Sequence, residues 1–299
     1  MSKHIVITSG FPAAGKSTLV NKYIKDGYYN LNRDDSGKSI SELHAQVEGV
    51  MQLNEKVILD NTYITAQHRA EVIAIAKKIG AKITVLRLNT TIEESQFNAC
   101  WRTELGGRHV PATALFAAKK SFEKISPTEG FDEIIDVPFK RVMPAEYTNK
   151  ALILDYDNTI RTTKSGAKYP SDPADVVAIP GVSAKLKEFK DAGYLLLGTS
   201  NQSFVGKGEL PEATCIECFE RTNQLLDADI DYLFCPDAAF PIKSYDRKPL
   251  PGMGVKHVVK YKLDPSKCIY VGDATTDKTF AFRCGFKFVH ADDLLSLRP

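Results

Sequence analysis

Two short strings in this sequence have residues and spacings suited to chemistry on phosphate groups. The first, Gly10–Ser17, reads G-F-P-A-A-G-K-S and fits the pattern G-x-x-x-x-G-K-[ST]. The second, Asp155–Thr159, reads D-Y-D-N-T and places two carboxylates two residues apart. The first pattern is typical of loops that hold nucleotide phosphates, and the second of carboxylates that attack phosphorus. We therefore expect one site that adds phosphate and another that removes it.

The first string stands between an apolar run at 5–8 and a helical pattern at 16–25, as a phosphate-binding loop requires. Lys16 would reach the β- and γ-phosphates of ATP, Ser17 would ligate Mg²⁺, and Thr18 would assist at the α-phosphate. A glycine-containing turn that binds nothing is the alternative, which the flanking strand and helix disfavour. The predicted ATP-binding residues here are Gly10, Pro12, Ala13, Ala14, Gly15, Lys16, Ser17 and Thr18.

A second acidic string, Asn30–Asp35, follows the helix that the loop opens. A carboxylate there could accept the proton of an attacking hydroxyl, and Asp34 is the predicted base. Arg33 and Asp35 would contact the acceptor. A turn that caps the following helix is the alternative, with a stronger claim on Asp35.

Asp60, Asn61 and Thr62 leave the apolar run at 57–59, so we expect them at the same sheet edge, in contact with the acceptor or a metal ion. For Thr62, the cap of a helix at 66–78 is an equal alternative.

Arg102 and Arg108 flank Gly106 and Gly107, a composition that suits a mobile lid over ATP. Surface arginines without a partner are the alternative. Arg69 and the pair Lys119 and Lys120 are predicted to be solvated helix charges.

In the second string, Asp155 ends an apolar strand and would be the nucleophile. Asp157 would protonate the leaving alcohol and then activate water, and its backbone carbonyl would bind Mg²⁺. Further along, Lys248 would neutralise the intermediate. Asp273 and Asp277 follow another apolar strand as predicted Mg²⁺ ligands. The predicted contacts to the substrate phosphate are Thr199, Ser200, Asn201 and Arg247, with a surface role as the alternative for Arg247.

Composition limits the class of protein. Of 299 residues, 43% are hydrophobic, 25% are charged and the formal net charge is +2, so a broad polybasic surface that coats nucleic acid is excluded. No apolar run is long enough for a membrane span, and the first residues leave no room for a signal peptide. The six cysteines do not suggest a disulfide framework, so we expect a cytoplasmic protein with reduced thiols. Any nucleic-acid contact should be local.

Apolar runs alternate with helical patterns in both halves, which predicts an α/β fold of two domains, each a mainly parallel sheet flanked by helices. The predicted domains are 1–140 and 149–299, joined by a proline-containing connector. The predicted strands are 5–8, 56–59, 82–87, 151–155, 195–199, 232–235, 268–271 and 286–289. The predicted helices are 16–25, 66–78, 111–125, 181–192, 215–226 and 252–261.

The succession G-F-P-A-A-G-K-S-T, N-L-N-R-D-D, L-D-N-T and an arginine segment ending in V-P resembles the kinase domain of phage-type polynucleotide kinase–phosphatases. The resemblance implies a 5′-hydroxyl polynucleotide acceptor and places the general base at Asp34. The family commonly has an arginine three residues after that base. Here that position is Gly37, followed by Lys38, which is a candidate replacement.

Residues 150–299 resemble the haloacid-dehalogenase phosphatases, and the strings S-N-Q and R-K-P-L-P-G-M resemble polynucleotide 3′-phosphatases and histidinol- and heptose-phosphate phosphatases. The sugar-phosphate relatives often carry a zinc loop with C-x-H and C-x-C. Here only Cys235 keeps its residue among the four ligand positions, so we expect no zinc. The role of Cys215 and Cys218 stays open between apolar packing and metal or redox use.

Together the resemblances imply a bifunctional enzyme that heals RNA or DNA ends, with Mg²⁺ at both sites and ATP as co-substrate. It would phosphorylate 5′-hydroxyls, remove 3′-phosphates, with 2′,3′-cyclic phosphates as a further candidate, and hand the ends to a nucleic-acid ligase. The phage relatives imply a bacterial or phage-infected cell and suggest a homo-oligomer. The alternative is a metabolic kinase fused to a sugar- or nucleotide-phosphate phosphatase, because the charge is near neutral and the arginine after Asp34 is missing.

Overall fold

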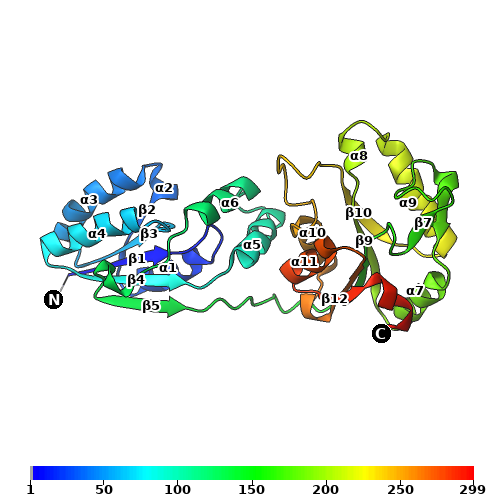
Figure 1. Ribbon diagram of the computed structural model, residues 1–299. Coiled ribbons are helices and arrows are strands. Elements are labelled where there is room, and N and C mark those ends of the chain that lie inside the picture. The colour runs from blue at the N-terminus through cyan, green and yellow to red at the C-terminus, as the bar shows by residue number, and fades with distance from the viewer. Residues whose placement is uncertain (1–2) are drawn as a thin grey trace. The chain divides into compact units, whose positions relative to one another are not determined.

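A computed structural model describes residues 3–299 and all their side chains except those of Asp34 and Asp35. The chain divides into two compact units, one of residues Met1–Asn98 and Thr113–Arg141, the other of Ala99–Ala112 and Val142–Pro299. Figure 1 colours the chain from its N-terminal unit in blue to its C-terminal unit in red. Each unit is built on its own five-stranded sheet.

The N-terminal unit holds a parallel sheet with strand order β2-β3-β1-β4-β5. Its strands are β1 (His4–Ser9), β2 (Tyr29–Asn32), β3 (Lys56–Asp60), β4 (Lys82–Leu88) and β5 (Glu133–Val137). Its helices are α1 (Lys16–Lys25), α2 (Arg33–Ser36), α3 (Ile40–Leu53), α4 (Ala66–Ile79) and α6 (Ala112–Ser121), with α5 (Ile92–Glu104) shared between the units by the division above.

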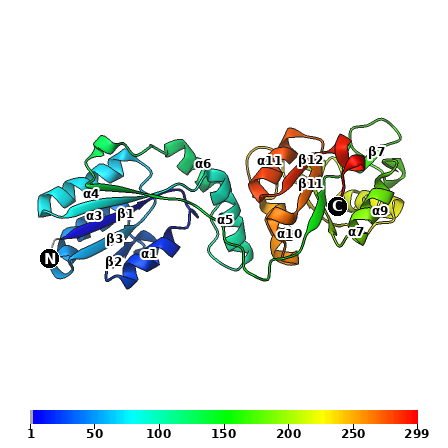
Figure 2. The same ribbon diagram turned by 90° about the horizontal axis from the view of Figure 1, so that it is seen from below.

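Alternate residues of β1 point to opposite faces of this sheet. Ile5 and Ile7 pack with Val47 of α3 and Val72 of α4, whereas Val6 packs with residues of α1. Figure 1 shows α3 and α4 side by side, and Figure 2 shows α1 away from them. A sheet covered on both faces requires strands that are apolar throughout, which is why the runs in the sequence are continuous rather than alternating.

The C-terminal unit repeats this design with strand order β10-β9-β6-β11-β12, again parallel, and a separate antiparallel pair β7-β8. The strands are β6 (Ala151–Leu154), β7 (Arg161–Thr163), β8 (Val176–Ala178), β9 (Leu195–Asn201), β10 (Asp231–Cys235), β11 (Ile269–Gly272) and β12 (Lys287–His290). The helices are α7 (Val182–Asp191), α8 (Ser203–Gly206), α9 (Glu212–Leu226), α10 (Gly252–Tyr261) and α11 (Thr275–Cys284). Short 3₁₀ turns cover Pro127–Glu129, Pro173–Asp175, Pro265–Lys267 and Ala291–Ser296.

Two cores sandwich this second sheet. Leu152 and Leu154 of β6 pack with α7 and α9, and Ile153 packs with α10 and α11. The predicted α/β architecture of two parallel sheets is confirmed. The predicted helices at 16–25 and 252–261 have the observed bounds, and the others differ at their ends. The predicted helix at 111–125 is the most overextended, because α6 ends at Ser121 and the next residues leave the helix to bond elsewhere.

The sequence patterns did not predict β2, β5, the β7-β8 pair, the short helices α2 and α8, or the longer helices α3, α5 and α11. Within the described residues, no helix is both long and apolar enough to cross a membrane.

Candidate active sites

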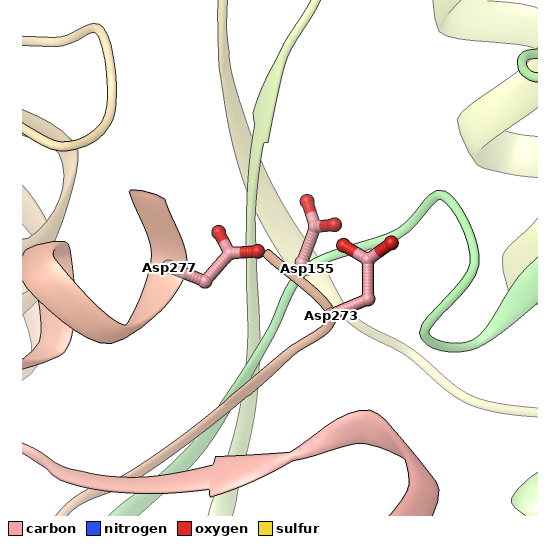
Figure 3. Close-up of side chains that lie close together, drawn as sticks. All are labelled: Asp155, Asp273 and Asp277. Carbon is pink, nitrogen blue, oxygen red and sulfur yellow. The ribbon is translucent and has the colours of Figure 1, made fainter. Parts of the chain in front are cut away.

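The aspartates of the C-terminal unit gather at the carboxyl edge of its sheet. Asp155 directly follows β6, and Asp273 and Asp277 follow β11. One carboxylate oxygen from each lies within 4.8 Å of the others. Figure 3 shows the three side chains close together, with the carboxylates of Asp155 and Asp273 pointing the same way and Asp277 beside them. Oxygen ligands at this spacing fit a hard cation such as Mg²⁺.

Lys248 is the buried counter-charge of this cluster. Its Nζ lies 2.7 Å from Asp155 Oδ1 and 2.8 Å from Asp277 Oδ1. The same Nζ donates to the Thr199 carbonyl at 3.1 Å and to the Tyr270 hydroxyl at 2.9 Å. Burial alone would lower the pKa of Lys248, but the surrounding carboxylates raise it well above its usual value. Lys248 therefore stays protonated, as a group that neutralises charge on a phosphorylated aspartate must.

Burial also acts on Asp155. It raises the pKa of Asp155 to about 7, with the charges of Asp277 and Asp157 adding to the rise and the ammonium of Lys248 opposing it. For Asp273 too, burial and the neighbouring Asp277 raise the pKa. Clustered carboxylates that cost free energy to ionise together favour a bound cation, because a divalent ion offsets their mutual repulsion.

The string Thr199–Asn201 ends β9, and its side chains form hydrogen bonds with neighbouring residues of the phosphatase site. The Asn201 side chain donates to the Lys248 carbonyl at 3.0 Å and accepts from the Lys248 N–H at 2.9 Å. The Thr199 hydroxyl bonds the Tyr270 hydroxyl at 3.0 Å, and Ser200 Oγ accepts from Gln202. Asn201 thus fixes the backbone that carries Lys248, and the phosphate contacts predicted for these residues stay predictions.

Asp157 has both carboxylate oxygens occupied. Arg161 Nε donates to Oδ1 at 2.8 Å, and Gln202 Nε2 donates to Oδ2 at 3.0 Å. Asp157 lies outside the cluster formed by the other three aspartate carboxylates.

Arg247 is half-buried, and its Nη1 donates to Ser203 Oγ at 2.7 Å and to the Asp237 carbonyl at 2.6 Å. It is held beside α8, the short helix that follows the Asn201 string. A contact with substrate phosphate is untested by this geometry.

In the N-terminal unit the phosphate loop joins β1 to α1. Gly15 takes φ +91°, a conformation that a side chain would strain. Thr90 Oγ1 donates to the Ala14 carbonyl at 2.9 Å, and Asn98 Nδ2 donates to the Ala13 carbonyl at 3.0 Å. These bonds hold the loop from the segment between β4 and α5 and from α5 itself. They leave the first turn of α1 open, where Ser17 and Thr18 are exposed.

Lys16 is directed back over the loop. Its Nζ donates to the Phe11 carbonyl at 2.6 Å and to the Gly10 carbonyl at 3.4 Å. Pro12 lies half-buried within the same loop. The ammonium is therefore placed over the segment whose N–H groups would surround phosphates.

The predicted acceptor residues lie at the end of β3. Asp60 is buried and accepts from Asn32 Nδ2 at 2.9 Å, and Asn61 is buried beside it. The Thr62 carbonyl accepts from the Gly10 N–H at 3.0 Å, which ties this loop to the phosphate loop. Thr62 does not cap α4, because the N-cap is Thr65.

Arg33 is exposed on α2. The side chains of Asp34 and Asp35, the predicted base and a predicted acceptor contact, lie outside the part of the chain that the structure describes. Arg102 and Arg108 belong to Ala99–Ala112, which groups with the C-terminal unit. Arg102 Nε donates to the Arg108 carbonyl at 2.9 Å and closes the glycine-containing turn between them. Their contact with ATP stays a prediction.

The expectation for Arg69 is wrong. Its side chain is 0% exposed, pairs with Glu129 at 2.7 Å, and donates to the carbonyls of Tyr63, Glu123 and Lys124. Helical periodicity could not reveal this, because the carbonyls it bonds come from distant irregular segments. Lys119 and Lys120, by contrast, are exposed as expected.

Sequence reasoning gave no role to Tyr270 or Arg161, and it included Gln202 only as part of the S-N-Q string. Tyr270 stands within an apolar strand and Arg161 two residues after the D-Y-D-N-T string, so each has a position in a recognised segment but no motif of its own.

Cys215 and Cys218 are buried on α9, and burial raises the pKa of their thiols to about 12 and about 11. Neutral buried thiols fit the apolar alternative better than metal ligation. Among described residues, the three clustered aspartates are the one group of three or more His, Cys, Asp or Glu side chains spaced for a metal ion.

Two family models match the chain. Residues 150–294 match the model described as polynucleotide kinase 3 phosphatase, and residues 5–125 match the model described as an AAA domain. The chain also matches a bifunctional polynucleotide phosphatase/kinase of Schizosaccharomyces pombe, at 29% identity over 49% of this chain and 36% of that protein. The chain thus spans about a third of that relative's length.

A second relative is the D-glycero-beta-D-manno-heptose-1,7-bisphosphate 7-phosphatase of Haemophilus influenzae, 31% identical over 43% of this chain and 73% of that protein. Among solved structures, one from the Pnkp1/Rnl/Hen1 RNA repair complex aligns with 97% of this chain and 96% of its own, at 18% identity and a TM-score of 0.33.

The match to the AAA-domain model includes the phosphate loop, and the match to the polynucleotide kinase 3 phosphatase model includes the aspartate cluster. The chain therefore carries a C-terminal domain of the polynucleotide kinase 3 phosphatase family, within the haloacid-dehalogenase phosphatases, and an AAA-type P-loop kinase domain ahead of it.

Proposed function

We propose that this protein heals broken nucleic-acid strands, transferring the γ-phosphate of ATP to 5′-hydroxyl ends and removing 3′-phosphates from the opposite ends. One observation carries the proposal: a phosphate loop and a lysine-neutralised aspartate cluster occur in one chain whose phosphatase half matches a polynucleotide family. Both terminal defects must be corrected before a ligase can join a strand, which gives the fusion its purpose.

In the phosphatase, Asp155 is the nucleophile and forms an aspartyl phosphate, with Lys248 neutralising it. Asp157 donates the proton to the leaving sugar oxygen and then takes one from water. Asp155, Asp273 and Asp277, with the Asp157 carbonyl, are the residues that would hold Mg²⁺. The ion would supply positive charge against the phosphoryl oxygens.

A polynucleotide substrate is supported by the rim of the phosphatase site. Tyr169 packs edge-on against Phe204 with ring centroids 5.5 Å apart, and the ammonium groups of Lys168 and Lys207 lie 5.3 Å from the centroids of these respective rings. Lys168 also interacts electrostatically with Asp273. Aromatic faces beside cations suit a single strand, because bases stack on rings while the lysines contact phosphates.

In the kinase, Lys16 and the loop backbone hold the ATP phosphates, Ser17 ligates Mg²⁺, and Asp34 accepts the proton of the 5′-hydroxyl. Arg102 and Arg108 close over ATP. Arg33, Asp35, Asp60, Asn61 and Thr62 contact the acceptor. Phe11 of the loop packs on Phe122 with ring centroids 5.0 Å apart, which offers an aromatic surface for the terminal base.

The decisive experiment gives the full chain matched RNA and DNA oligonucleotides that bear a 5′-hydroxyl and a 3′-phosphate. We expect label transfer from [γ-³²P]ATP to the 5′ end and release of inorganic phosphate from the 3′ end, both abolished by EDTA. A 2′,3′-cyclic end and the two sugar types are tested in parallel to define the preference. Inert oligonucleotides beside turnover of small metabolites would overturn the proposal.

The second candidate is a metabolic kinase fused to a sugar-phosphate phosphatase. The identity of 31% to a heptose-bisphosphate phosphatase favours it for the C-terminal half. Heptose 1,7-bisphosphate belongs in the substrate panel for this reason. A kcat/KM higher for that sugar than for every 3′-phosphorylated oligonucleotide would select this candidate.

A further inference from the structure

Arg161, the first residue of β7, is a charged side chain in the interior of the C-terminal unit. It is 1% exposed, and its Nε donates to Asp157 Oδ1 at 2.8 Å. Its Nη1 donates to Thr222 Oγ1 on α9 at 3.2 Å. The guanidinium lies 4.6 Å from the ring centroid of Phe219 and 5.2 Å from that of Tyr156. The proton-transfer candidate Asp157 is thus tied to a helix distant in sequence.

Backbone hydrogen bonds hold Arg161 in place within its turn. The Arg161 N–H donates to the Tyr156 carbonyl at 3.1 Å, and the Asn158 N–H donates to the Arg161 carbonyl at 2.9 Å. The backbones of Arg161 and Asp157 also pair as an isolated β-bridge. The turn therefore closes on itself, and the guanidinium returns to the carboxylate four residues earlier with little freedom to move.

Fold stability alone does not account for a charge at this place. A buried ion pair costs desolvation free energy that its own attraction only partly offsets, and well-packed apolar residues of similar volume are often as stabilising. The aromatic rings of Phe219 and Tyr156 would accept such a residue. What an apolar side chain could not do is grip one chosen oxygen of Asp157.

The second oxygen of Asp157 is held from another strand. Gln202, after β9, donates from Nε2 to Asp157 Oδ2 at 3.0 Å and to Ser200 Oγ at 2.9 Å. Its N–H donates to the Cys235 carbonyl at 2.7 Å, so its own backbone is anchored to β10. Asp157 therefore has no free rotation about its carboxyl group, and Arg161 supplies the charged half of the restraint.

We propose that Arg161 is a positioning residue, which orients the Asp157 carboxyl for proton transfer to the leaving alcohol. The inference rests on the proposed phosphatase chemistry. As the Asp155 Oδ–P bond forms and the P–O bond to the sugar breaks, the proton of Asp157 passes to the leaving oxygen. Water then attacks phosphorus, gives its proton to Asp157, and the Asp155 Oδ–P bond breaks to release inorganic phosphate.

The test compares two leaving groups in one enzyme. A nitrophenolate leaves without protonation, whereas a sugar alkoxide needs a proton, so a misplaced Asp157 slows formation of the aspartyl phosphate from the oligonucleotide but not from the nitrophenyl ester. The later attack of water is common to both substrates, so the comparison uses kcat/KM, which reports only the steps up to the aspartyl phosphate. For Arg161→Lys we expect kcat/KM on a 3′-phosphorylated oligonucleotide to fall by about 10²-fold, while kcat/KM on p-nitrophenyl phosphate stays within about threefold of wild type. Equal losses on both substrates, or no loss on either, would overturn the inference.

Thr222→Val is the milder companion, because it removes only the hydroxyl that accepts from Arg161 Nη1 and keeps the side-chain shape. It should show the same selectivity at a loss of about threefold to tenfold. If Arg161→Lys does not fold, judged by circular dichroism and kinase activity, this variant decides. Wild-type enzyme that hydrolyses a sugar phosphate but no oligonucleotide would refute the proposed substrate alone, and the comparison with the nitrophenyl ester would then use that sugar phosphate.

Discussion

The two phosphate sites of this chain are organised in opposite ways. In the C-terminal unit the chemical side chains are buried and bonded to one another, with Lys248 joined to both Asp155 and Asp277. In the N-terminal unit the corresponding groups stand on a loop and an exposed helix turn, and Lys16 bonds the carbonyls of its own loop. Both sites occupy the carboxyl edge of a parallel sheet, so the fold does not cause this difference.

We attribute the difference to the groups that carry the charge in each site, which are side chains of the protein in the phosphatase and the bound ATP in the kinase. An enzyme that forms a covalent bond to its own carboxylate needs that carboxylate neutralised by fixed groups in a low-dielectric pocket. A kinase that moves a phosphoryl group between two bound molecules relies on backbone N–H groups and on charges that arrive with ATP. We therefore expect the phosphatase to fail when side-chain chemistry changes, and the kinase to be governed by its loop.

The largest effect is expected at Asp155, the proposed nucleophile. Asp155→Asn keeps the side-chain shape but removes the attacking charge, so phosphatase kcat should fall by about 10⁴-fold or more. Kinase activity, measured by ³²P transfer to a 5′-hydroxyl oligonucleotide, should not change. Asp227→Asn, at an exposed αL position after α9, is the matched control and should leave both activities intact. Loss of both activities in Asp155→Asn would show that the sites are not independent.

Lys16→Ala tests the other half. Removing the ammonium over the loop should lower kinase kcat by about 10²- to 10³-fold, because it takes away charge that stabilises the transferring phosphoryl group. Release of phosphate from a 3′-phosphorylated end should persist. Lys22→Ala, an exposed lysine of the same helix, provides the control. A kinase that tolerated Lys16→Ala would contradict the assignment of this loop to ATP.

The charged residues that meet in the C-terminal site could be predicted from the sequence. Asp155, Lys248, Asp273 and Asp277 each directly follow a strand or stand in a recognised string, and the structure brings them into contact or into one cluster. Parallel topology guarantees that strand ends meet, so linear motifs were sufficient to assemble this group.

Residues that reach the site through side-chain packing were out of reach. Tyr270 reads as a strand residue, and its hydroxyl meets Lys248 and Thr199 only because β11 and β9 flank β6. Arg69 reads as a charge on an amphipathic helix, but it bonds carbonyls of segments more than fifty positions away. Neither periodicity nor a local motif encodes such pairings.

Arg69 offers a sharper contrast with Arg161, since both are buried arginines. Arg69 binds the Glu129 carboxylate and backbone carbonyls of the Tyr63 loop and of the segment after α6, groups with no proposed chemical role. Arg161 instead binds the carboxylate of Asp157, the proposed proton donor. Arg69→Met should lower the free energy of unfolding of the N-terminal unit by about 3–5 kcal/mol, because Glu129 and the carbonyls lose their donor. The measurement is chemical denaturation in which unfolding of the N-terminal unit is monitored by the loss of kinase activity. Substitution of the exposed Arg221 by Met is the control. A stability unchanged by the substitution would mean that water replaces the guanidinium at no cost.

The smallest effect concerns acceptor binding at the loop-based site. Phe122 follows α6 and packs on Phe11, and the next residue ties this segment to the β3–α4 loop through the Glu123 N–H and the Ile64 carbonyl at 2.8 Å. The pair is therefore fixed beside both the phosphate loop and the predicted acceptor residues.

Phe122→Ala removes one stacking face while the loop backbone stays intact. We expect KM for a 5′-hydroxyl oligonucleotide to rise about fivefold to tenfold, the loss of roughly 1 kcal/mol of base stacking, with KM for ATP unchanged. Phe282→Ala, at an exposed phenylalanine of the C-terminal unit, should have no effect on either constant. If KM rose for ATP alone, the aromatic pair would instead contact the adenine. The kinase site would then have no aromatic contact for the acceptor base, unlike the aromatic rim proposed for the phosphatase site.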